Sequence, residues 1–479
     1  MRQLLTVFLL TGSVAAAEKP NVLFIVSDDL TNQTLGCYGS KICRTPNLDA
    51  LAQSGVRFDR AYCQFPLCNP SRASFLTGLR PDTIRIYENA TQFRQTKPDA
   101  VSIGQTFQKA GYAVTRVGKL YHYGVPGQIG TDGLDDKPSW QSVINPRGRD
   151  KDDEDNNLIF TLNPNGKGSA RYGGTLSWLA SGGKDEDMTD GKIAAAVVGE
   201  IERNRDRPFF LACGFFRPHT PYVAPKADFD RYPPQGIPLP TVPGGHVAAG
   251  PAAAFASQKK EQVDRLNDDL RRQALQAYYA STSHMDRQVG IVLAALDRMK
   301  LRQKTIVVFI SDHGYHLGEH DLWQKMSLFE NSARVPLIVS APGMAGNGRS
   351  TGRTVELIDL HATLADLCGL PIPATDGRSV KPLLNDPSAA WDKPAITQVS
   401  RGTPTTTGEQ RPKGQPWFMG YSVRTERYRY TEWQTGVKGV QLFDYETDPG
   451  ELRNLATDPN HTETVKAMKA LLPRYAVRE

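Results

Sequence analysis

The chain has 479 residues, of which 39% are hydrophobic and 23% are charged, and its formal net charge is +6 at pH 7. Its length allows one large hydrophobic core and a smaller unit, and these fractions are ordinary for a globular protein. The mild basic excess suits an acidic ligand, and no run of Lys and Arg is dense enough to indicate a nucleic-acid partner.

Residues 1–17 have the pattern of a secretory signal peptide. Arg2 precedes an apolar run over residues 4–10, and three alanines at 15–17 stand directly before Glu18, which matches a cleavage site. A buried first strand is the alternative, but the next apolar run has a boundary of its own. The sequence therefore predicts export to a periplasm, a lumen or the outside, and no later stretch is long and apolar enough to span a membrane.

Two apolar, β-branched runs, over residues 21–26 and 305–310, predict strands that are buried on both faces of a parallel sheet. Each run leads into polar residues at the strand end: Asp28 and Asp29 after the first, Asp312 and His313 after the second. Adjacent buried carboxylates repel each other and lose hydration, a cost that a bound cation offsets. A turn capped by aspartate is the alternative for either pair taken alone.

The repetition of this layout favours a metal site over an ordinary turn. If the two strands are parallel neighbours, their polar ends lie at one edge of the sheet, where open α/β folds place their sites. Oxygen ligands with one imidazole suit Ca²⁺ or Mg²⁺ better than a metal that seeks thiolates.

Cys68 opens a Cys-Asn-Pro-Ser-Arg segment that ends at Arg72 and predicts a nucleophile at the start of a helix. Pro70 fits the first helical turn, and Gly78 ends the helix. The helix N-terminus and Arg72 favour negative charge, either on the thiol or on a sulfate or phosphate ligand. For a lone cysteine the alternative is a side chain that only packs.

Helices and strands alternate along most of the chain, which is typical of a doubly wound α/β sheet. Helices are predicted over residues 45–54, 101–110, 188–203, 261–299 and 355–368, and strands over 111–117, 208–216 and 334–340. The apolar stripe of the long helix includes Val263. Residues 371–394 read as a linker, and the residues beyond it predict a small antiparallel unit that closes with a helix over 464–475.

Residues 128–190 are polar and rich in turn residues, which predicts a surface insertion. The acidic run over 152–155 could bind a metal, but a solvated loop is the preferred interpretation. Cys37 and Cys43 could form a local disulfide, which the sequence does not decide.

Four further polar side chains follow predicted strands. Lys119 and His122 come after the strand at 111–117 and can both reach one anion, lysine as a point charge and histidine as a proton carrier. His219 stands between two prolines after the strand at 208–216, a stiff mount for a group that meets a leaving group. Lys325 lies in a polar loop beyond His313; His316 and His320 in that loop either bind substrate or order the loop. A surface lysine and a structural histidine are the alternatives for each taken alone.

Several of these motifs resemble signatures of the sulfatase family. The resemblance covers nearly the whole chain and is carried by Cys-x-Pro-Ser-Arg at 68–72, the residues 76–81 after it, Gly-Lys-x-x-His at 118–122, His-x-Pro at 219–221 and the segment 442–455. It implies that a formylglycine-generating maturase oxidises Cys68 to formylglycine. It also implies one Ca²⁺ per chain, bound by residue 68 together with Asp28, Asp29, Asp312 and His313.

The fold implied by the resemblance is alkaline phosphatase-like. This is an α/β fold with a large mixed, mostly parallel sheet sandwiched by helices, in a catalytic domain at 18–380. A small α+β C-terminal subdomain on an antiparallel sheet is expected at 381–479.

The reaction implied is hydrolysis of a sulfate ester. The expected roles are a base at Asp312, charge compensation by Arg72, Lys119 and Lys325, protonation of the leaving oxygen by His219, and release of sulfate assisted by His122. Residues 75–83, 118–122 and 317–320 resemble most the iduronate-2-sulfatase group, which implies a 2-O-sulfated uronic acid in an acidic glycan. The loop at 127–190 has no counterpart in that resemblance.

Two other functions stay open from the sequence. A phosphodiester or phosphonate-ester hydrolase of the same superfamily can use such a site, because a metal, a nucleophile and basic groups suit any tetrahedral anion. A non-catalytic protein that binds sulfated glycans would keep Cys68 as a thiol.

Overall fold

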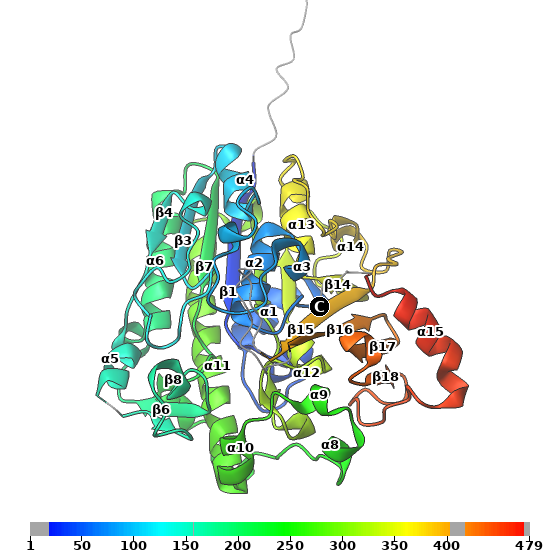
Figure 1. Ribbon diagram of the computed structural model, residues 1–479. Helices are drawn as coiled ribbons and strands as arrows, with labels where there is room; N and C mark the ends of the chain where they lie inside the picture. Colours follow the sequence, from blue (N-terminus) through cyan, green and yellow to red (C-terminus); the bar gives the residue numbers. More distant parts are fainter. Residues whose placement is uncertain (1–18, 157, 403–416, 474–479) are drawn as a thin grey trace, which may run out of the picture.

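The computed structural model describes residues 19–156, 158–402 and 417–473, and the predicted signal segment at 1–17 lies outside this part of the chain (Figure 1). The main sheet of the described residues has nine strands in the order β12, β2, β13, β9, β1, β7, β3, β4, with β14 paired to β2. Their bounds are Arg334–Val335, Val56–Tyr62, Leu337–Ser340, Thr305–Ser311, Asn21–Ser27, Phe209–Gly214, Ala113–Gly118, Ser142–Ile144 and Ser350–Glu356, respectively.

The centre of this sheet is parallel. β1 pairs in parallel with β9 on one side and with β7 on the other, and β7 pairs in parallel with β3. Ser27 of β1 lies opposite Ser311 of β9, so the polar residues that follow the two strands leave the sheet at the same level. β13 runs antiparallel to β9 and β2, which makes the sheet mixed.

Helices cover both faces of the sheet (Figure 1). Val22, Phe24 and Val26 of β1 belong to one apolar cluster, and Leu23 and Ile25 belong to another, because successive side chains of a strand point to opposite faces. The first cluster includes residues of α2 (Cys68–Thr77), α4 (Ile103–Lys109) and α13 (Asp359–Leu367). The second includes residues of α1 (Pro46–Gln53), α6 (Thr189–Arg203) and α11 (Asp268–Arg298). The predicted fold class is therefore confirmed.

The long helix predicted over 261–299 is two helices. α10 spans Lys260–Arg265, and α11 begins at Asp268 because the side chain of Asn267 caps it, accepting a hydrogen bond from the Leu270 N–H at 2.9 Å. Val263, which the sequence pattern assigns to the buried stripe, is 59% exposed on α10. The apolar spacing in the sequence runs through both helices, but of the two only α11 contributes side chains to the core beside the sheet.

Two other predicted elements have different bounds. The strand predicted over 334–340 is divided into β12 and β13 at Pro336, which has no N–H to donate to a ladder. The helix predicted over 355–368 starts later, because residues up to Glu356 belong to β14 and pair with β2.

The C-terminal part contains a four-stranded antiparallel sheet. Its strands are β15 (Ala395–Arg401), β16 (Phe418–Arg424), β17 (Tyr428–Trp433) and β18 (Val440–Asp444), followed by α15 (Thr462–Ala470). The predicted linker at 371–394 contains the short helix α14 (Lys381–Asn385), and β15 begins directly after it. The domain boundary at 380 stays a prediction.

The segment 128–190 is more integrated than a surface insertion. It supplies β4 to the main sheet and α5 (Arg149–Asp155), and its strands β5 (Phe160–Thr161) and β6 (Ser177–Ser181) form a small sheet with β8 (Tyr222–Pro225). The prediction of a solvated acidic loop was wrong: these residues lie in α5, and the buried Asp153 accepts a hydrogen bond from Ser181 at 2.8 Å.

All six cysteines are free thiols, so Cys37 and Cys43 are not joined. Among the described helices, none combines the length and the apolar character that a membrane span requires.

Candidate active site

The polar strand ends meet at one edge of the main sheet, as the sequence predicts. The side chains brought together there are Asp28 and Asp29 after β1, Lys119 and His122 after β3, His219 after β7, Asp312 and His313 after β9, Lys325 after the short strand β11 (Trp323–Gln324), and Cys68 and Arg72 on α2. The parallel pairing of β3, β7, β1 and β9 explains this convergence, because the carboxyl ends of parallel strands lie at the same edge.

Cys68 is the first residue of α2 and is 1% exposed. The N–H groups of the first turn do not need further acceptors, because Pro70 has no N–H and the Asn69 N–H donates to Oδ1 of Asn89 at 3.1 Å. Gly78, with a φ of 72°, ends the helix in the left-handed region, where glycine is favoured. The predicted helix and its position for Cys68 are confirmed.

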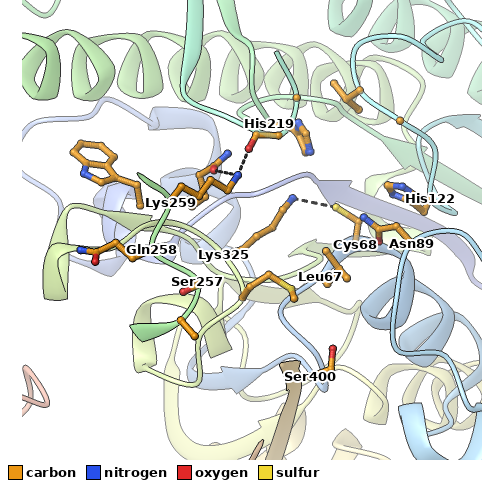
Figure 2. A pocket seen from close by; sticks show the side chains of 18 of the residues that line it. Leu67, Cys68, Asn89, His122, His219, Ser257, Gln258, Lys259, Lys325 and Ser400 are labelled. Carbon is orange, nitrogen blue, oxygen red and sulfur yellow. Dashed lines mark hydrogen bonds between the residues drawn. The ribbon is translucent and has the colours of Figure 1, made fainter. Parts of the chain in front are cut away.

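The thiol of Cys68 lies among charged groups. Its Sγ is 3.2 Å from Nζ of Lys325 (Figure 2). It is also 3.5 Å from Nε2 of His313 and 3.7 Å from Oδ1 of Asp28. Burial opposes ionisation, but the ammonium groups of Lys325 and Lys119 hold the pKa of this thiol well below its usual value. The site therefore favours an anion at position 68.

A set of ligand atoms that could hold a metal ion surrounds Cys68. Ligand atoms of Asp28, Asp29, Cys68 and His313 all lie within 4.8 Å of one another, and all four residues are buried. Oδ2 of Asp29 is buried without a hydrogen-bond partner, which is costly for a carboxylate oxygen unless a cation meets it. Asp312 adjoins the set, with its Oδ2 3.6 Å from Nε2 of His313. These donors suit a divalent cation that prefers oxygen ligands.

Arg72 and Lys119 hold the carboxylates of Asp28 and Asp312 in position. Arg72 is fully buried and donates to Oδ1 of Asp28 at 3.0 Å and to Oδ2 of Asp312 at 2.9 Å, and its remaining nitrogen donates to backbone oxygens of Lys119 and Leu120. Lys119 donates to the other oxygen of Asp28. Although burial disfavours the charged form, these cations lower the pKa of Asp28 well below its usual value. Burial raises the pKa of Asp312 to about 6.

Lys325 and His313 also bring positive charge close to Cys68. Despite burial, Asp29, whose Oδ1 is 2.6 Å from Nζ of Lys325, raises the pKa of that lysine. Burial alone would lower the pKa of His313, but the neighbouring carboxylates, Asp312 above all, outweigh burial and raise it to about 9. The two charges face Cys68 from different loops.

His219 and His122 line the cavity above Cys68. The Nδ1–H of His219 donates to the backbone oxygen of Thr220 at 2.6 Å, which leaves Nε2 facing the site, 3.8 Å from Oδ2 of Asp29. Burial lowers the pKa of His122, so the neutral imidazole is favoured there.

A clamp from the segment 128–190 and α6 holds the chain on either side of His219. Arg217 donates to Asp150 of α5 and to the backbone oxygen of Pro221 at 2.6 Å. The carboxylate of Asp190 accepts hydrogen bonds from the backbone N–H groups of Phe216 and Arg217 at 2.9 and 3.0 Å. The sequence pattern missed both aspartates, since each lies in a stretch that reads as polar surface.

The cavity has a volume of about 570 Å³, which is in the range of small-ligand pockets. Cys68, His122, His219 and Lys325 reach it from the sheet edge and neighbouring loops (Figure 2). Three further segments form its rim: 173–174, 256–259 and 400–402. Lys259 and Arg401 on this rim were missed by the sequence analysis, because no motif joins them.

His316 and His320 do not line this cavity. Nε2 of His316 bonds to Oγ of Ser327 at 2.7 Å, and the ring of His320 stacks on Phe329 with 4.0 Å between centroids. Of the two roles left open for these histidines, the contacts favour ordering of the loop.

Comparison with known proteins extends over nearly the whole chain. The family described as Sulfatase matches residues 20–370, and that described as N-sulphoglucosamine sulphohydrolase, C-terminal, matches residues 318–478. The chain belongs to the sulfatase family. It is a sulfuric ester hydrolase, as the sequence motifs predict.

Two curated relatives and one solved structure illustrate the similarity. Iduronate 2-sulfatase of Mus musculus is 32% identical to this sulfatase, over 93% of this chain and 92% of the relative. Delta 4,5-hexuronate-2-O-sulfatase of Bacteroides thetaiotaomicron is 26% identical, over 98% and 91%. The phosphonate monoester hydrolase of Agrobacterium radiobacter shares the fold with a TM-score of 0.76, at 22% identity over 94% of each chain.

Proposed function

We propose that this sulfatase removes the 2-O-sulfate of a uronic acid in an acidic glycan, using a formylglycine formed from Cys68 and one bound Ca²⁺. The observation that carries the proposal is the position of Cys68 at the start of α2, in contact with Lys325 and within a set of buried side chains that could hold a metal ion. Support for the substrate comes from two relatives whose names specify a 2-sulfated hexuronate.

The two added groups supply chemistry that the thiol alone lacks. Ca²⁺ would be held by Asp28, Asp29, Asp312, His313 and residue 68, and it would favour an ionised nucleophile and offset the charge of the sulfate. An aldehyde at position 68 hydrates to two hydroxyl groups, so that one can attack sulfur and the other can later expel sulfate. A plain serine or cysteine ester has no such route to release.

Carboxylates and cations around residue 68 are proposed to prepare the attack. Asp312 accepts the proton of the attacking hydroxyl. Asp28 is the alternative acceptor for this proton, since its Oδ1 lies 3.7 Å from Sγ of Cys68. Lys325 lines the cavity and would meet the sulfuryl oxygens. Arg72 and Lys119 offset their charge from beneath, mainly by holding the carboxylates in position.

The two histidines are proposed to move protons. Nε2 of His219 faces the site and would protonate the departing sugar oxygen, while Nδ1 is fixed by the backbone of Thr220. His122, held neutral by burial, would take the proton of the second hydroxyl as sulfate leaves.

Maturation and export complete the proposal. A formylglycine-generating maturase would act on Cys68, and residues 1–17 would direct export before cleavage near Ala17. We also propose the division into a catalytic domain at 18–380 and a C-terminal subdomain at 381–479, which the family resemblance implies.

The test is the mass of the peptide around Cys68 after expression with and without a maturase, followed by assays on three esters. The matched substrates are a 2-O-sulfated uronide, a 6-O-sulfated hexosamine and an aryl phosphonate monoester. Conversion of the thiol to an aldehyde with the highest kcat/KM on the uronide supports the proposal. A preference for the phosphonate, or binding of the uronide without turnover at full metal occupancy, would replace it with one of the two other functions.

A further inference from the structure

The cavity above Cys68 carries more positive charge than the reaction uses. Its lining includes Lys325, Lys259 and Arg401, and among the described residues it includes no Asp or Glu. Lys325 is paired with Asp29 beneath the cavity. Lys259 and Arg401 form no ion pair with any carboxylate in the described part of the chain.

Lys259 is held in place by neutral groups. Its ammonium donates to the backbone oxygen of Gly174 and, at 2.7 Å, to Oε1 of Gln324, and an ammonium has a third donor. Glu261 and Asp29 raise the pKa of Lys259 without contacting it, but burial dominates and lowers it to about 8. A partly buried cation without an anionic partner is costly, and an anion brought by a ligand offsets that cost.

Arg401 adds charge on another part of the same rim. It is 7% exposed, lies over the ring of Trp433 at 4.6 Å and donates to the backbone oxygens of Ala253 and Met326. Its Nη2 is buried without a hydrogen-bond partner among the described residues. Both rim cations are therefore uncompensated, and the field in the cavity favours a ligand with more than one negative charge.

The position of Lys259 separates it from the reacting group. Figure 2 shows Lys325 between Lys259 and Cys68, with the amine of Lys325 directed at the thiol. A scissile sulfate at Cys68 would therefore meet Lys325, which leaves Lys259 for a different group. A cavity of about 570 Å³ has room for a sugar that carries both.

We propose that Lys259 binds a second anionic group of the substrate, a carboxylate or a second sulfate, while the scissile sulfate lies at Cys68. The proposal rests on the proposed function in that the scissile group is a sulfate. It makes Lys259 a residue that selects acidic sugars over neutral ones.

Binding without turnover tests this directly. In a Cys68→Ala background, calorimetry compares a 2-O-sulfated uronide with its methyl ester, which keeps the sulfate and loses the carboxylate charge. The acid is expected to bind about 10–100-fold more tightly than the ester, the size of a charged hydrogen bond. Lys259→Met is expected to remove that preference and to change ester affinity by less than about 3-fold.

Lys260 offers a matched control. It is the next residue along the chain, and its side chain is 90% exposed. Lys260→Met should leave the preference for the acid unchanged. Lys259→Arg keeps the charge and should retain most of the preference.

Turnover by the matured enzyme gives an independent measurement. Lys259→Met should raise KM for the acid with little change in kcat, and should leave both constants for the ester near wild type. A neutral hexose with one sulfate, compared with the same sugar carrying two, shows whether a second sulfate replaces the carboxylate.

The opposing outcomes are distinct. Two results would overturn the proposal: equal affinity of the unsubstituted pocket for acid and ester, or an equal fall in affinity for both in Lys259→Met. Lys259 would then only join Gly174 to Gln324 through its hydrogen bonds. If the matured enzyme cleaves no sulfate ester, the proposed function fails, while the binding preference still decides the role of Lys259.

Discussion

The Sγ atom of Cys68 lies 3.5 Å from Nε2 of His313, although 245 residues separate the two in the sequence. The contact follows from the pairing of β1 with β9, which brings the loop after β9 to the edge where α2 begins. The motif at 68–72 marks Cys68 within its own segment, but only the fold brings its thiol beside the imidazole and the carboxylates that could hold a metal ion.

Replacement of Cys68 tests the nucleophile. Cys68→Ala removes the thiol and with it the aldehyde proposed to form from it, so we expect kcat to fall by about 10⁴-fold or more. Cys63, also buried, provides the control: Cys63→Ala should lower stability but retain turnover once folded. Initial rates with a 2-O-sulfated uronide and circular dichroism of both variants are the measurements, and residual activity of Cys68→Ala within 10-fold of wild type contradicts the role.

Removal of Asp29 tests the metal site. Asp29→Asn takes away the carboxylate whose Oδ2 is buried without a hydrogen-bond partner. We expect Ca²⁺ affinity to fall by more than the roughly 10–100-fold typical of replacing a residue that only orients a metal ligand. At 100 times its Kd, Ca²⁺ should stabilise the wild type by about 2.7 kcal/mol, as measured by denaturant unfolding with and without a chelator. The exposed Asp99 is the control, since Asp99→Asn should keep the full increment. An unchanged increment in Asp29→Asn speaks against this site.

Replacement of His219 tests proton donation to the leaving group. His219→Gln should lower kcat by about 10²–10⁴-fold on a sugar sulfate, whose alcohol leaves poorly without a proton. The loss should be far smaller on 4-nitrophenyl sulfate, whose leaving group is a stable phenolate. Equal losses on the two substrates would show that His219 acts on something other than the leaving oxygen.

The buried pair of Asp150 and Arg217 should position His219. Asp150→Asn leaves a buried cation without its anion, at a cost of about 3–5 kcal/mol, and should reduce kcat on sugar sulfates more than on 4-nitrophenyl sulfate. Asp152 lies on the same helix but is 61% exposed, so Asp152→Asn should change neither quantity appreciably.

The pH dependence of this pair has a defined sign. Burial alone would raise the pKa of Asp150, but Arg217 and Thr189 hold it below its usual value. Its contribution is therefore present above the unfolded pKa of about 3.9 and is lost as the pH falls through the lower folded pKa. In urea unfolding, the stability difference between wild type and Asp150→Asn should be constant from pH 5 to 7 and should shrink below about pH 4. A constant difference down to pH 3 contradicts this.

The charge of Lys259 should appear in the pH profile of kcat/KM. Because burial lowers the pKa of Lys259 to about 8, kcat/KM for the 2-O-sulfated uronide should fall above that pH, while that for the methyl ester should not follow it. Lys325 lowers and Glu261 raises the pKa of Lys259, so neither residue is substituted in this test. Lys259→Arg should move the fall to higher pH, since guanidinium stays charged. Parallel profiles for acid and ester would rule the titration out.

The central features of the fold could be predicted from the sequence because they depend on local patterns. Continuous apolar runs identify β1 and β9, and their polar ends predict the convergence of Asp28 and His313. Asp150 and Lys259 could not be found this way. Their positions depend on contacts with Arg217 and with Gly174, which no period or motif in their own segments encodes.

The division of α10 from α11 lies between these cases. Asn267 stands before an acidic first turn, which is a readable start signal, but the apolar spacing runs across it and suggests one helix. Side-chain capping at Asn267 decides the break, and periodicity alone does not report it.

The floor and the rim of the cavity have different origins in the chain. Strand ends and α2 build the floor, whereas the rim comes from residues 173–174, 256–259 and 400–402, which lie in connecting segments or at the end of β15. Connecting segments tolerate insertion and exchange far better than central strands. Descendants of such a protein can therefore acquire new ligand preferences by exchanging residues 173–174 and 256–259, while the strand ends beneath them are inherited unchanged.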